Sequence, residues 1–301
     1  MSLRHFDYRP HDGFVAPARA APQLWRLFLG LILAAGIFLA LSQMIFGTLF
    51  SLMPPETARA IVADGQTGQT AGGLLILLFQ LGLMAVAAGL VVIMVHKRRP
   101  LSLFGPLGLA VRQFTVVLIA MVLLTFVLWL LPPYDFGEPL ERNMALGRWL
   151  LLLPIALFAV LIQSGAEEVF FRGYIQQQLA ARFRSPLIWA VVPAVLFGLG
   201  HYLPESAGSN AWTIALWATV FGILMADLTA RAGTLGPAMA VHFANNVSAI
   251  LLTSVADEMS GLALYVLPFG IRDEAQMAAW LPVDFSFMLV SWLAARLAIR
   301  A

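Results

Sequence analysis

The chain has 301 residues, of which 60% are hydrophobic and 11% are charged, with a formal net charge of +2 and a mean hydropathy of +0.85. A soluble domain carries about 25% charged residues, so this composition predicts an integral membrane protein. The scattered basic residues do not support nucleic-acid binding, and the absence of cysteine excludes disulfides, cysteine-ligated metals and a cysteine nucleophile.

The chain begins with a polar segment, residues 1–23, which we expect to be a cytoplasmic N-terminal tail. It contains arginines and acids but lacks the apolar region of a signal peptide. Residues 24–301 are predicted to form a single multi-span membrane domain, with a catalytic core at about 149–254. No internal repeat is visible.

Eight apolar runs follow in the sequence. A transmembrane helix needs about 20 apolar residues, which seven runs satisfy, while Asp284 and Arg296 shorten the eighth. The predicted fold class is therefore an all-α integral membrane protein with about eight transmembrane helices and a polar site inside the bundle. A shorter apolar stretch, 261–270, is expected to be re-entrant or interfacial. The eight runs are 27–53, 73–95, 113–131, 149–166, 186–203, 211–226, 233–253 and 281–299.

The distribution of basic residues predicts the orientation of this bundle. Cytoplasmic loops carry an excess of Lys and Arg. With eight spans and a cytoplasmic N-terminus, twelve basic residues fall inside and four fall outside, namely Arg59, Arg142, Arg148 and Arg272. We therefore expect a multi-pass protein of the cytoplasmic (inner) membrane with both termini in the cytoplasm.

The fourth run continues into the charged stretch QSGAEEVFFRG, which places Glu167, Glu168 and Arg172 at membrane depth. A charge there costs about 2.5–3.5 kcal/mol and usually has a partner or a function. Glu168 and Arg172 are one helical turn apart in the order that favours an ion pair. Glu167 points about 100° away and has no such partner. Beyond them, Tyr174 and residues 176–178 are expected to form a wet cytoplasmic extension of this span.

Two further runs each carry a histidine, His201 in the fifth and His242 in the seventh, and Asn246 lies one turn after His242. At about 1.5 Å per residue, these three residues and Glu167 lie at similar depths, so we expect them to meet. Two His and one Glu with an open position form a known catalytic zinc site. Zinc lowers the pKa of its bound water and polarises a carbonyl group, so Zn²⁺ is the predicted cofactor.

Three motifs in these runs resemble those of the CPBP family, the CAAX-processing and bacteriocin-processing intramembrane proteases. GAEEVFFRG matches the EExxxR motif of the family, in which Glu168 and Arg172 resemble the supporting pair. FGLGH, ending at His201, matches FxxxH, and HFANN, starting at His242, matches a His followed four residues later by Asn. The resemblance covers about 149–254. It implies an eight-span helical fold and peptide-bond hydrolysis in a cavity that faces the cytoplasm.

The resemblance also implies roles for the individual residues. By motif position, Glu167 resembles the residue that binds or activates the catalytic water. His201 and His242 resemble its metal-ligand or water-positioning partners, and Asn246 resembles an oxyanion or metal contact. The catalytic and metal-binding prediction therefore comprises Glu167, His201, His242 and Asn246.

The predicted function is an intramembrane metal-dependent endopeptidase that cleaves a membrane-associated protein or peptide near its C-terminus, as a CAAX protease does. One alternative is an ion- or proton-coupled transporter that uses Glu167, the histidines and Arg172 as a path, although the sequence lacks the repeats typical of transporters. Another is a non-catalytic protein that binds or shields a membrane partner, such as an immunity protein. The expected partners are the protein or peptide substrate and the lipid bilayer, without nucleic acid.

Overall fold

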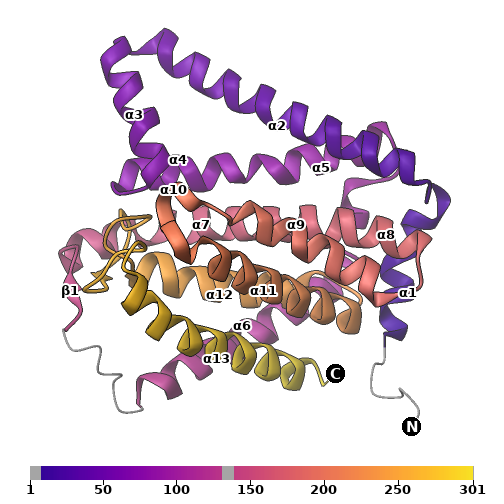
Figure 1. Cartoon of the computed structure of the whole chain (residues 1–301). Helices are drawn as coiled ribbons and strands as arrows, with labels where there is room; N and C mark the ends of the chain where they lie inside the picture. Colours follow the sequence, from indigo (N-terminus) through magenta and orange to yellow (C-terminus); the bar gives the residue numbers. More distant parts are fainter. Residues whose placement is uncertain (1–7, 131–138, 301) are drawn as a thin grey trace.

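The computed structural model describes residues 8–130 and 139–300, and α-helices dominate it (Figure 1). Residues 1–7 of the predicted tail and the end of the predicted third span lie outside the described residues. The first half of the chain contains α1 (Arg9–Val15), the 3₁₀ turn η1 (Ala16–Ala20), α2 (Leu24–Leu52), α3 (Pro55–Thr67), α4 (Ala71–Leu81), α5 (Leu83–Met94), the 3₁₀ turn η2 (Pro100–Leu103) and α6 (Leu107–Trp129).

The second half of the chain contains one unusually long helical run. In this run α7 (Leu146–Glu168), the π-helical segment η3 (Val169–Gln176) and α8 (Gln177–Arg182) follow without a break over 37 residues. The later helical elements are the π-segment η4 (Leu187–Val191), α9 (Val192–Gly200), α10 (Pro204–Ala207), the 3₁₀ turn η5 (Gly208–Asn210), α11 (Ala211–Ala232), α12 (Gly236–Asn246), the π-segment η6 (Val247–Leu252) and α13 (Glu274–Ile299).

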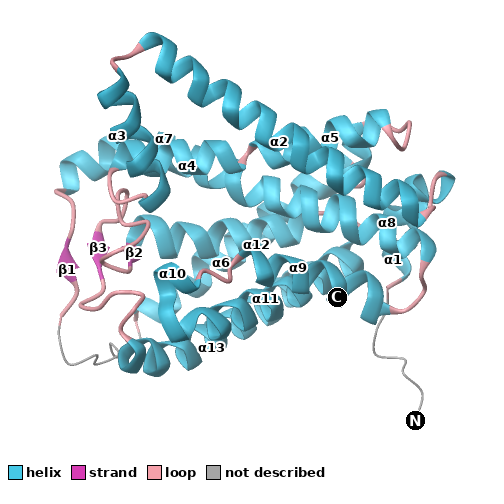
Figure 2. Ribbon diagram, turned by 45° about the horizontal axis from the view of Figure 1, so that its top comes forward, coloured by secondary structure: helices cyan, strands magenta, loops and turns pink. Residues whose placement is uncertain are grey.

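The helices that carry the predicted site residues occupy the middle of the molecule. Helices α2, α4 and α5 lie on one side and α6 and α13 on the other, with α7, α9, α11 and α12 between them (Figures 1 and 2). Buried apolar side chains of α6, α9, α11, α12 and α13 form one core cluster, and those of α4, α7 and η6 form another. The polar residues of α7 and α12 are therefore enclosed by apolar layers on both sides.

Six helices within the described residues are long and apolar enough to cross a membrane: Leu24–Leu52, Ala71–Met94, Leu107–Leu128, Leu146–Arg182, Pro204–Ala232 and Glu274–Ile299. The predicted fifth run is a shorter apolar helix, Leu187–Gly200, and the predicted seventh run is α12 with η6. The prediction of an all-α membrane protein is confirmed. The count of eight spans stays a prediction.

The two ends of the bundle differ in the elements that they contain. Helix α1 and the end of α13 lie together at one end, whereas α3, β1 and the start of α13 lie at the other (Figure 1). The four basic residues predicted to be outside lie in or beside α3, β1, the start of α7 and the start of α13. They therefore group at one end as the orientation requires, while the side of the membrane on which that end lies stays a prediction.

The N-terminal segment, α1 with η1, folds against α8 and α11. The side chains of Phe14 and Val15 are buried there, and Gln177 Nε2 donates a hydrogen bond of 2.6 Å to the Phe14 carbonyl. Gln176 Nε2 lies 3.3 Å from His11 Nε2, and Gln178 Nε2 donates to the carbonyl of residue 21. The segment and the residue after it thus supply partners for the NH₂ groups of three consecutive glutamines.

The prediction of a wet extension at Tyr174 and residues 176–178 is therefore wrong. None of these four side chains is more than 2% exposed. The N-terminal segment and the residue after it cover the glutamines and give their NH₂ groups partners, so these donors are buried with partners rather than hydrated. Among the described residues, Gln176 Oε1 is buried without a partner. Tyr174 instead places its hydroxyl 3.1 Å from His96 Nε2.

A small three-stranded sheet closes the end of the bundle opposite α1. Strand β3 (Tyr265–Val266) pairs antiparallel with β1 (Glu141–Arg142) and parallel with β2 (Thr253–Ser254). The sheet thereby ties the loop before α7 to the chain that follows α12 (Figure 2). The stretch 261–270, which contains β3, lies at this end of the bundle, and its position relative to the membrane stays a prediction.

Glycine residues allow α9 and α11 to pack closely beside the central helix. A Cβ atom at Gly222 would lie 2.8 Å from the Ala194 Cβ and 3.2 Å from Arg172 Nη2. A Cβ atom at Gly198 would overlap the Thr219 hydroxyl. Small residues of this kind permit close backbone approach between membrane helices, and here they bring α9 and α11 against the charged stretch of the central helix.

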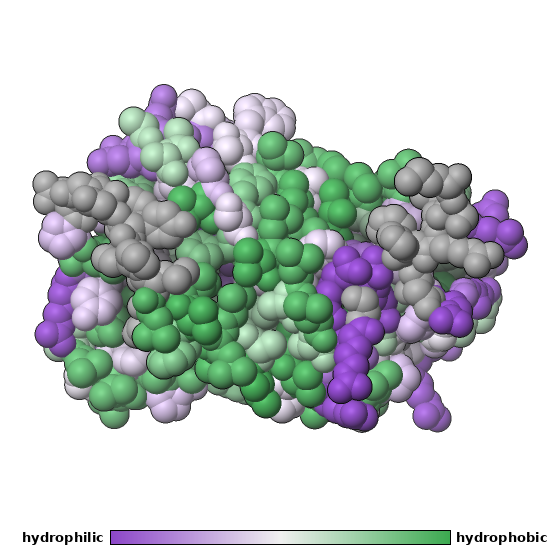
Figure 3. Space-filling model, turned by 90° about the horizontal axis from the view of Figure 1, so that it is seen from below, coloured by the Kyte–Doolittle hydropathy of each residue, from purple (hydrophilic) through white to green (hydrophobic). Residues whose placement is uncertain are grey.

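The surface agrees with a membrane environment. Large apolar side chains are exposed on several helices, for example Ile32 at 69%, Leu151 at 79% and Leu187 at 73%. The face seen in Figure 3 is apolar across its middle and hydrophilic toward both ends. A soluble protein rarely exposes so large an apolar surface, whereas a bilayer covers it.

Candidate active site

The charged stretch is buried where α7 passes into the π-helical segment. Glu167 is 8% exposed, Glu168 is 0% exposed, and His242 of the neighbouring α12 is 3% exposed. The π-segment η3 begins directly after Glu168. Isolated π-turns within α-helices occur frequently at functional sites. The backbone conformation and the buried charges therefore indicate a functional site at the same position.

Glu168 accepts two hydrogen bonds on one oxygen. Its Oε1 lies 3.0 Å from Arg172 Nη1 and 2.8 Å from His242 Nδ1. The predicted Glu168–Arg172 pair is therefore present, with both side chains at most 1% exposed. A guanidinium can only donate, and the carboxylate paired with it accepts, so His242 Nδ1 must carry the hydrogen. This leaves Nε2 on the other side of the imidazole ring.

Glu167 faces that second imidazole nitrogen. Its Oε2 lies 3.4 Å from His242 Nε2, and Oε2 has no hydrogen-bond partner among the described residues. With Nδ1–H donated to Glu168, a neutral imidazole presents the Nε2 lone pair to the Glu167 carboxylate, which is an unfavourable contact. A proton, a polarised water or a cation between the two atoms removes the conflict.

Asn246 lies one turn further along α12 but contacts a different residue of α7. Its Nδ2 donates a hydrogen bond of 2.8 Å to Gln163 Oε1, and its Oδ1 accepts one of 3.3 Å from Asn245 Nδ2. Gln163 is not among the predicted site residues. The sequence contained one signal for it, because Gln163 precedes Glu167 by four residues and so shares its helical face.

His201 is the predicted site residue that the structure keeps apart. Its Nδ1 lies 2.9 Å from the Phe197 carbonyl, one turn earlier in the same helix. Its ring packs 4.5 Å from the Phe197 ring, which in turn lies 6.0 Å from the His242 ring. Among the described residues, no hydrogen bond or ion pair joins His201 to Glu167 or His242. The expected contact is thus observed between Glu167 and His242, whereas the contacts of His201 are with Phe197.

Aromatic rings form one wall of the site. Phe221 of α11 lies 5.0 Å from the His242 ring in a T-shaped contact, and Phe197 of α9 lies 4.9 Å below the Arg172 guanidinium. A cation over an aromatic face is attracted by the quadrupole of the ring. The rings thereby hold Arg172 in place and exclude water from its pair with Glu168.

A metal ion would find two suitable donors here. Two ligand atoms of a tetrahedral zinc site with bonds of about 2.0–2.1 Å lie about 3.3 Å apart, and Glu167 Oε2 and His242 Nε2 are 3.4 Å apart. No group of three His, Cys, Asp or Glu side chains within the described residues is arranged to hold a metal ion. The structure thus fits two ligands of a zinc site, and the predicted cofactor stays a prediction.

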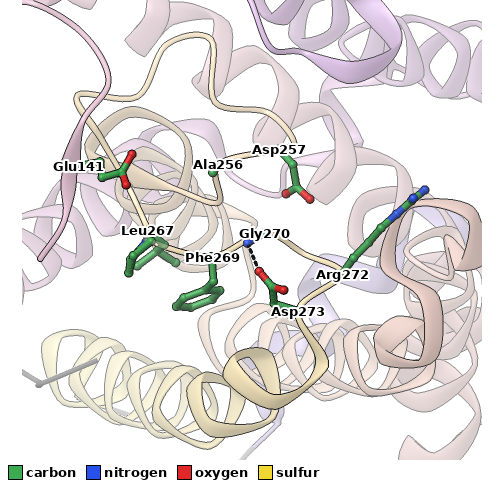
Figure 4. Close-up of a pocket in the computed structure, with 9 residues that line it drawn as sticks. Glu141, Ala256, Asp257, Leu267, Phe269, Gly270, Arg272 and Asp273 are labelled. Carbon is green, nitrogen blue, oxygen red and sulfur yellow. Dashed lines mark hydrogen bonds between the residues drawn. The ribbon is translucent and has the colours of Figure 1, made fainter. Parts of the chain in front are cut away.

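A pocket of about 360 Å³ lies elsewhere, at the end of the bundle with the small sheet. Figure 4 shows its charged lining, in which the Gly270 amide donates to Asp273. The lining residues are Glu141, Ala256, Asp257, Leu267, Pro268, Phe269, Gly270, Arg272 and Asp273. The pocket shares no residue with the site on α7 and α12, so the chemistry of that site does not depend on it.

Comparison with known proteins identifies the region that holds these residues. Residues 148–248 match the model of a family described as type II CAAX prenyl endopeptidase Rce1-like. These residues belong to the Rce1-like family. The Rce1-like region extends from α7 into η6, so it contains all the residues assigned above to the site. The CPBP resemblance predicted from three motifs is confirmed, and membership indicates an intramembrane protease.

The similarity extends beyond the Rce1-like region. The uncharacterized protein YyaK of Bacillus subtilis (strain 168) is 24% identical over 252 residues, which cover 78% of this chain and 80% of YyaK. No solved structure matches the chain significantly. The relative therefore extends the similarity to helices outside the Rce1-like region but adds no activity.

Proposed function

We propose that this Rce1-like membrane protease hydrolyses a peptide bond of a membrane-associated protein or peptide near its C-terminus, in the manner of a CAAX endopeptidase. The observation that carries the proposal is the buried Glu167 Oε2, which has no hydrogen-bond partner in the described chain and lies 3.4 Å from His242 Nε2. A buried acid with an incompletely paired carboxylate in an enclosed site is a candidate catalytic group.

In the proposed reaction Glu167 takes a proton from a water molecule while the oxygen of that water attacks the scissile carbonyl carbon. Such general-base catalysis contributes about 10²–10⁴ in rate. Glu168 accepts the hydrogen of His242 Nδ1 and so holds the imidazole ring with its Nε2 lone pair toward the water at Glu167. Asn246 Nδ2 donates to the developing oxyanion. The tetrahedral intermediate then expels the amine, which receives the proton that Glu167 took from the water, and the new carboxyl group releases its own proton to leave a carboxylate.

Zinc is the proposed cofactor, and Glu167 and His242 are the residues that would hold it. When bound, zinc lowers the pKa of the attacking water and polarises the carbonyl group. Metal analysis of the purified protein tests this part separately. About one zinc per chain, lost in Glu167→Ala and His242→Ala, supports it, whereas a fully active protein without zinc contradicts it.

Cleavage of defined peptides tests the function. The purified protein is incubated with a synthetic peptide that ends in Cys-aliphatic-aliphatic-X, with and without a farnesyl group on the cysteine, and products are identified by mass spectrometry. We expect release of the last three residues by the wild type and none by Glu167→Gln. A folded wild-type protein that cleaves neither peptide contradicts the CAAX proposal. Uptake of ions or protons by vesicles would then favour the transporter alternative. The absence of both cleavage and uptake would favour the non-catalytic alternative.

The proposed location is the inner membrane, with both chain ends in the cytoplasm. The observation that supports it is the position of α3, β1 and the starts of α7 and α13, which carry or adjoin the four predicted outside basic residues, at one end of the bundle (Figure 1). Reporter fusions after residue 301 and after Lys97 test this orientation. Both are expected to report the cytoplasm, and a periplasmic signal from either fusion contradicts it.

A further inference from the structure

We propose that Gln163 is a positioning residue for the hydrolysis, an inference that rests on the proposed function. Gln163 is 5% exposed, and its Oε1 accepts the 2.8 Å hydrogen bond from Asn246 Nδ2. In this role it fixes the orientation of the Asn246 amide, so that the second N–H of Nδ2 faces the oxygen of the reacting carbonyl.

The two helices meet in a regular antiparallel register. Gln163 pairs with Asn246, and four residues later on α7 Glu167 pairs with His242, which is four residues earlier on α12. Four residues advance a helix by about 6 Å. The two pairs therefore form neighbouring rungs about 6 Å apart.

This spacing suits the geometry of an attacked carbonyl group. Reacting atoms approach to about 3–3.5 Å, and an oxyanion donor lies about 2.7–3.1 Å from the oxygen. A carbonyl between the rungs therefore has its carbon within reach of a water at Glu167 and His242. Its oxygen is then within reach of Asn246 Nδ2, so one rung supplies the water and the other supplies the donor.

The bond to Gln163 determines which atom of Asn246 points into that space. An asparagine amide has a donating NH₂ and an accepting oxygen on opposite sides, and a flipped amide would present its oxygen to the oxyanion. Asn246 Oδ1 already accepts from Asn245 Nδ2 at 3.3 Å, and Gln163 Oε1 takes one N–H of Nδ2. Both contacts select the orientation in which a second N–H remains available.

A purely structural role is the competing explanation, because amide pairs also hold membrane helices together. The chain offers a matched control for it. Gln80 of α4 donates to Ser42 Oγ of α2 at 3.3 Å, outside the Rce1-like region. Gln80→Met removes an interhelical amide contact as Gln163→Met does, but it leaves the α7–α12 interface intact.

The first experiment measures kcat and KM for the farnesylated peptide. Gln163→Met is expected to lower kcat about 10- to 100-fold, as part of the loss that removal of an oxyanion donor causes, with KM within about twofold. In an Asn246→Ala background the same substitution should add no further loss, since the residues act as one unit. An equal loss in both backgrounds, or an equal kcat loss in Gln80→Met, overturns the proposal.

The second experiment does not depend on catalysis. The sequence has four asparagines, at positions 143, 210, 245 and 246, so ¹⁵N-asparagine labelling gives four side-chain amide signals, and Asn246→Ala assigns one of them. In the wild type one Asn246 side-chain proton should be shifted and slow to exchange, and Gln163→Met should abolish this, whereas Gln80→Met should not. Unchanged Asn246 signals in Gln163→Met overturn the Gln163 proposal. A wild type that cleaves no peptide but shows the bond overturns the hydrolytic function instead.

Discussion

Two buried acid–arginine pairs of the same local geometry have very different surroundings. Glu168 and Arg172 lie in the central helix, and Asp227 and Arg231 lie in α11. Each pair is one helical turn apart, with N···O distances of 3.0 and 2.8 Å respectively. Sequence spacing alone gives them the same description, so the difference between them comes from what the rest of the fold places around them.

The Asp227 cluster, which comprises Tyr8, Asp227, Arg231 and Trp292, is well supplied with hydrogen bonds. Both carboxylate oxygens accept from Arg231 Nε, at 2.9 and 2.8 Å. Tyr8 donates to Oδ1 at 2.7 Å, and Trp292 Nε1 donates to Oδ2 at 3.0 Å. These contacts join the chain before α1 to α11 and α13. Because the carboxylate is saturated, the cluster has a structural role.

The Glu167 cluster, which comprises Glu167, Glu168, Arg172 and His242, is incompletely paired. In the described chain, the Oε2 atoms of both glutamates and Arg172 Nη2 are buried without a hydrogen-bond partner. Buried polar groups are nearly always paired, and exceptions are candidates for groups that await a ligand. Burial of charge is common to both clusters, and the unsatisfied atoms distinguish the cluster that we propose to be reactive from the saturated Asp227 cluster.

The largest expected effect is a loss of cleavage in a variant of the Glu167 cluster that a variant of the Asp227 cluster does not show. His242→Gln should lower cleavage by about 10²–10⁴ through loss of the imidazole that positions the water for the general base Glu167, with little change in melting temperature. The matched change Asp227→Asn should lower the melting temperature and leave the cleavage rate per folded molecule unchanged. Peptide cleavage and thermal unfolding of both variants check this. A wild-type rate in His242→Gln would show that the cluster is not reactive.

The next effect tests the buried pair. Arg172→Ala leaves Glu168 charged without its guanidinium and should destabilise the protein by about 3–5 kcal/mol. Arg172→Lys should recover part of this because it keeps the charge but loses the planar guanidinium. Yield and thermal unfolding measure both. An Arg172→Ala protein that melts like the wild type would place the pair in water rather than in the core.

A smaller effect follows from His11, the buried histidine of the N-terminal segment. Burial lowers the pKa of His11 to about 4 from an ordinary value of 6.5. Its stabilising contribution is therefore complete above pH 6.5 and is lost as the pH falls toward 4, by about 1 kcal/mol between pH 6.5 and 5.5. Melting temperatures across this range should fall less steeply in His11→Gln than in the wild type. Equal slopes would show that His11 is accessible to water.

The smallest effect concerns the edge of the Asp227 cluster. Tyr8→Phe removes one of several donors to the Asp227 carboxylate and should cost about 1 kcal/mol, with no change in peptide cleavage. Thermal unfolding and the cleavage assay measure the two quantities. Loss of cleavage without loss of stability would mean that the N-terminal segment acts on the Glu167 cluster directly.

Two contacts that the sequence predicted follow from local helix geometry. The Glu168–Arg172 pair follows from one helical turn, and the approach of Glu167 to His242 follows from comparable depths on two spans. The bilayer restricts both helices to similar tilts and lengths, so depth along the helix is informative. The family motifs added the identity of the chemistry, which depth alone does not give.

Non-local packing explains what the sequence did not predict. The pairing of Gln163 with Asn246 depends on the register between α7 and α12. The burial of residues 176–178 depends on the N-terminal segment, more than 150 residues away in the chain. The ring of Phe197 contacts the rings of both His201 and His242, at 4.5 and 6.0 Å, and this packing depends on how α9 and α12 meet. None of these relations has a signature in a single run of residues.

The central claim is that Glu167 acts on the reacting water while its neighbour Glu168 holds His242. The most direct measurement compares the cleavage rates and melting temperatures of Glu167→Gln and Glu168→Gln at equal amounts of folded protein. We predict that Glu167→Gln loses at least about 10² in rate and melts at or above the wild-type temperature. Glu168→Gln should retain measurable cleavage and melt lower. The reverse order of rates would exchange the two roles, and wild-type cleavage by both variants would contradict the account.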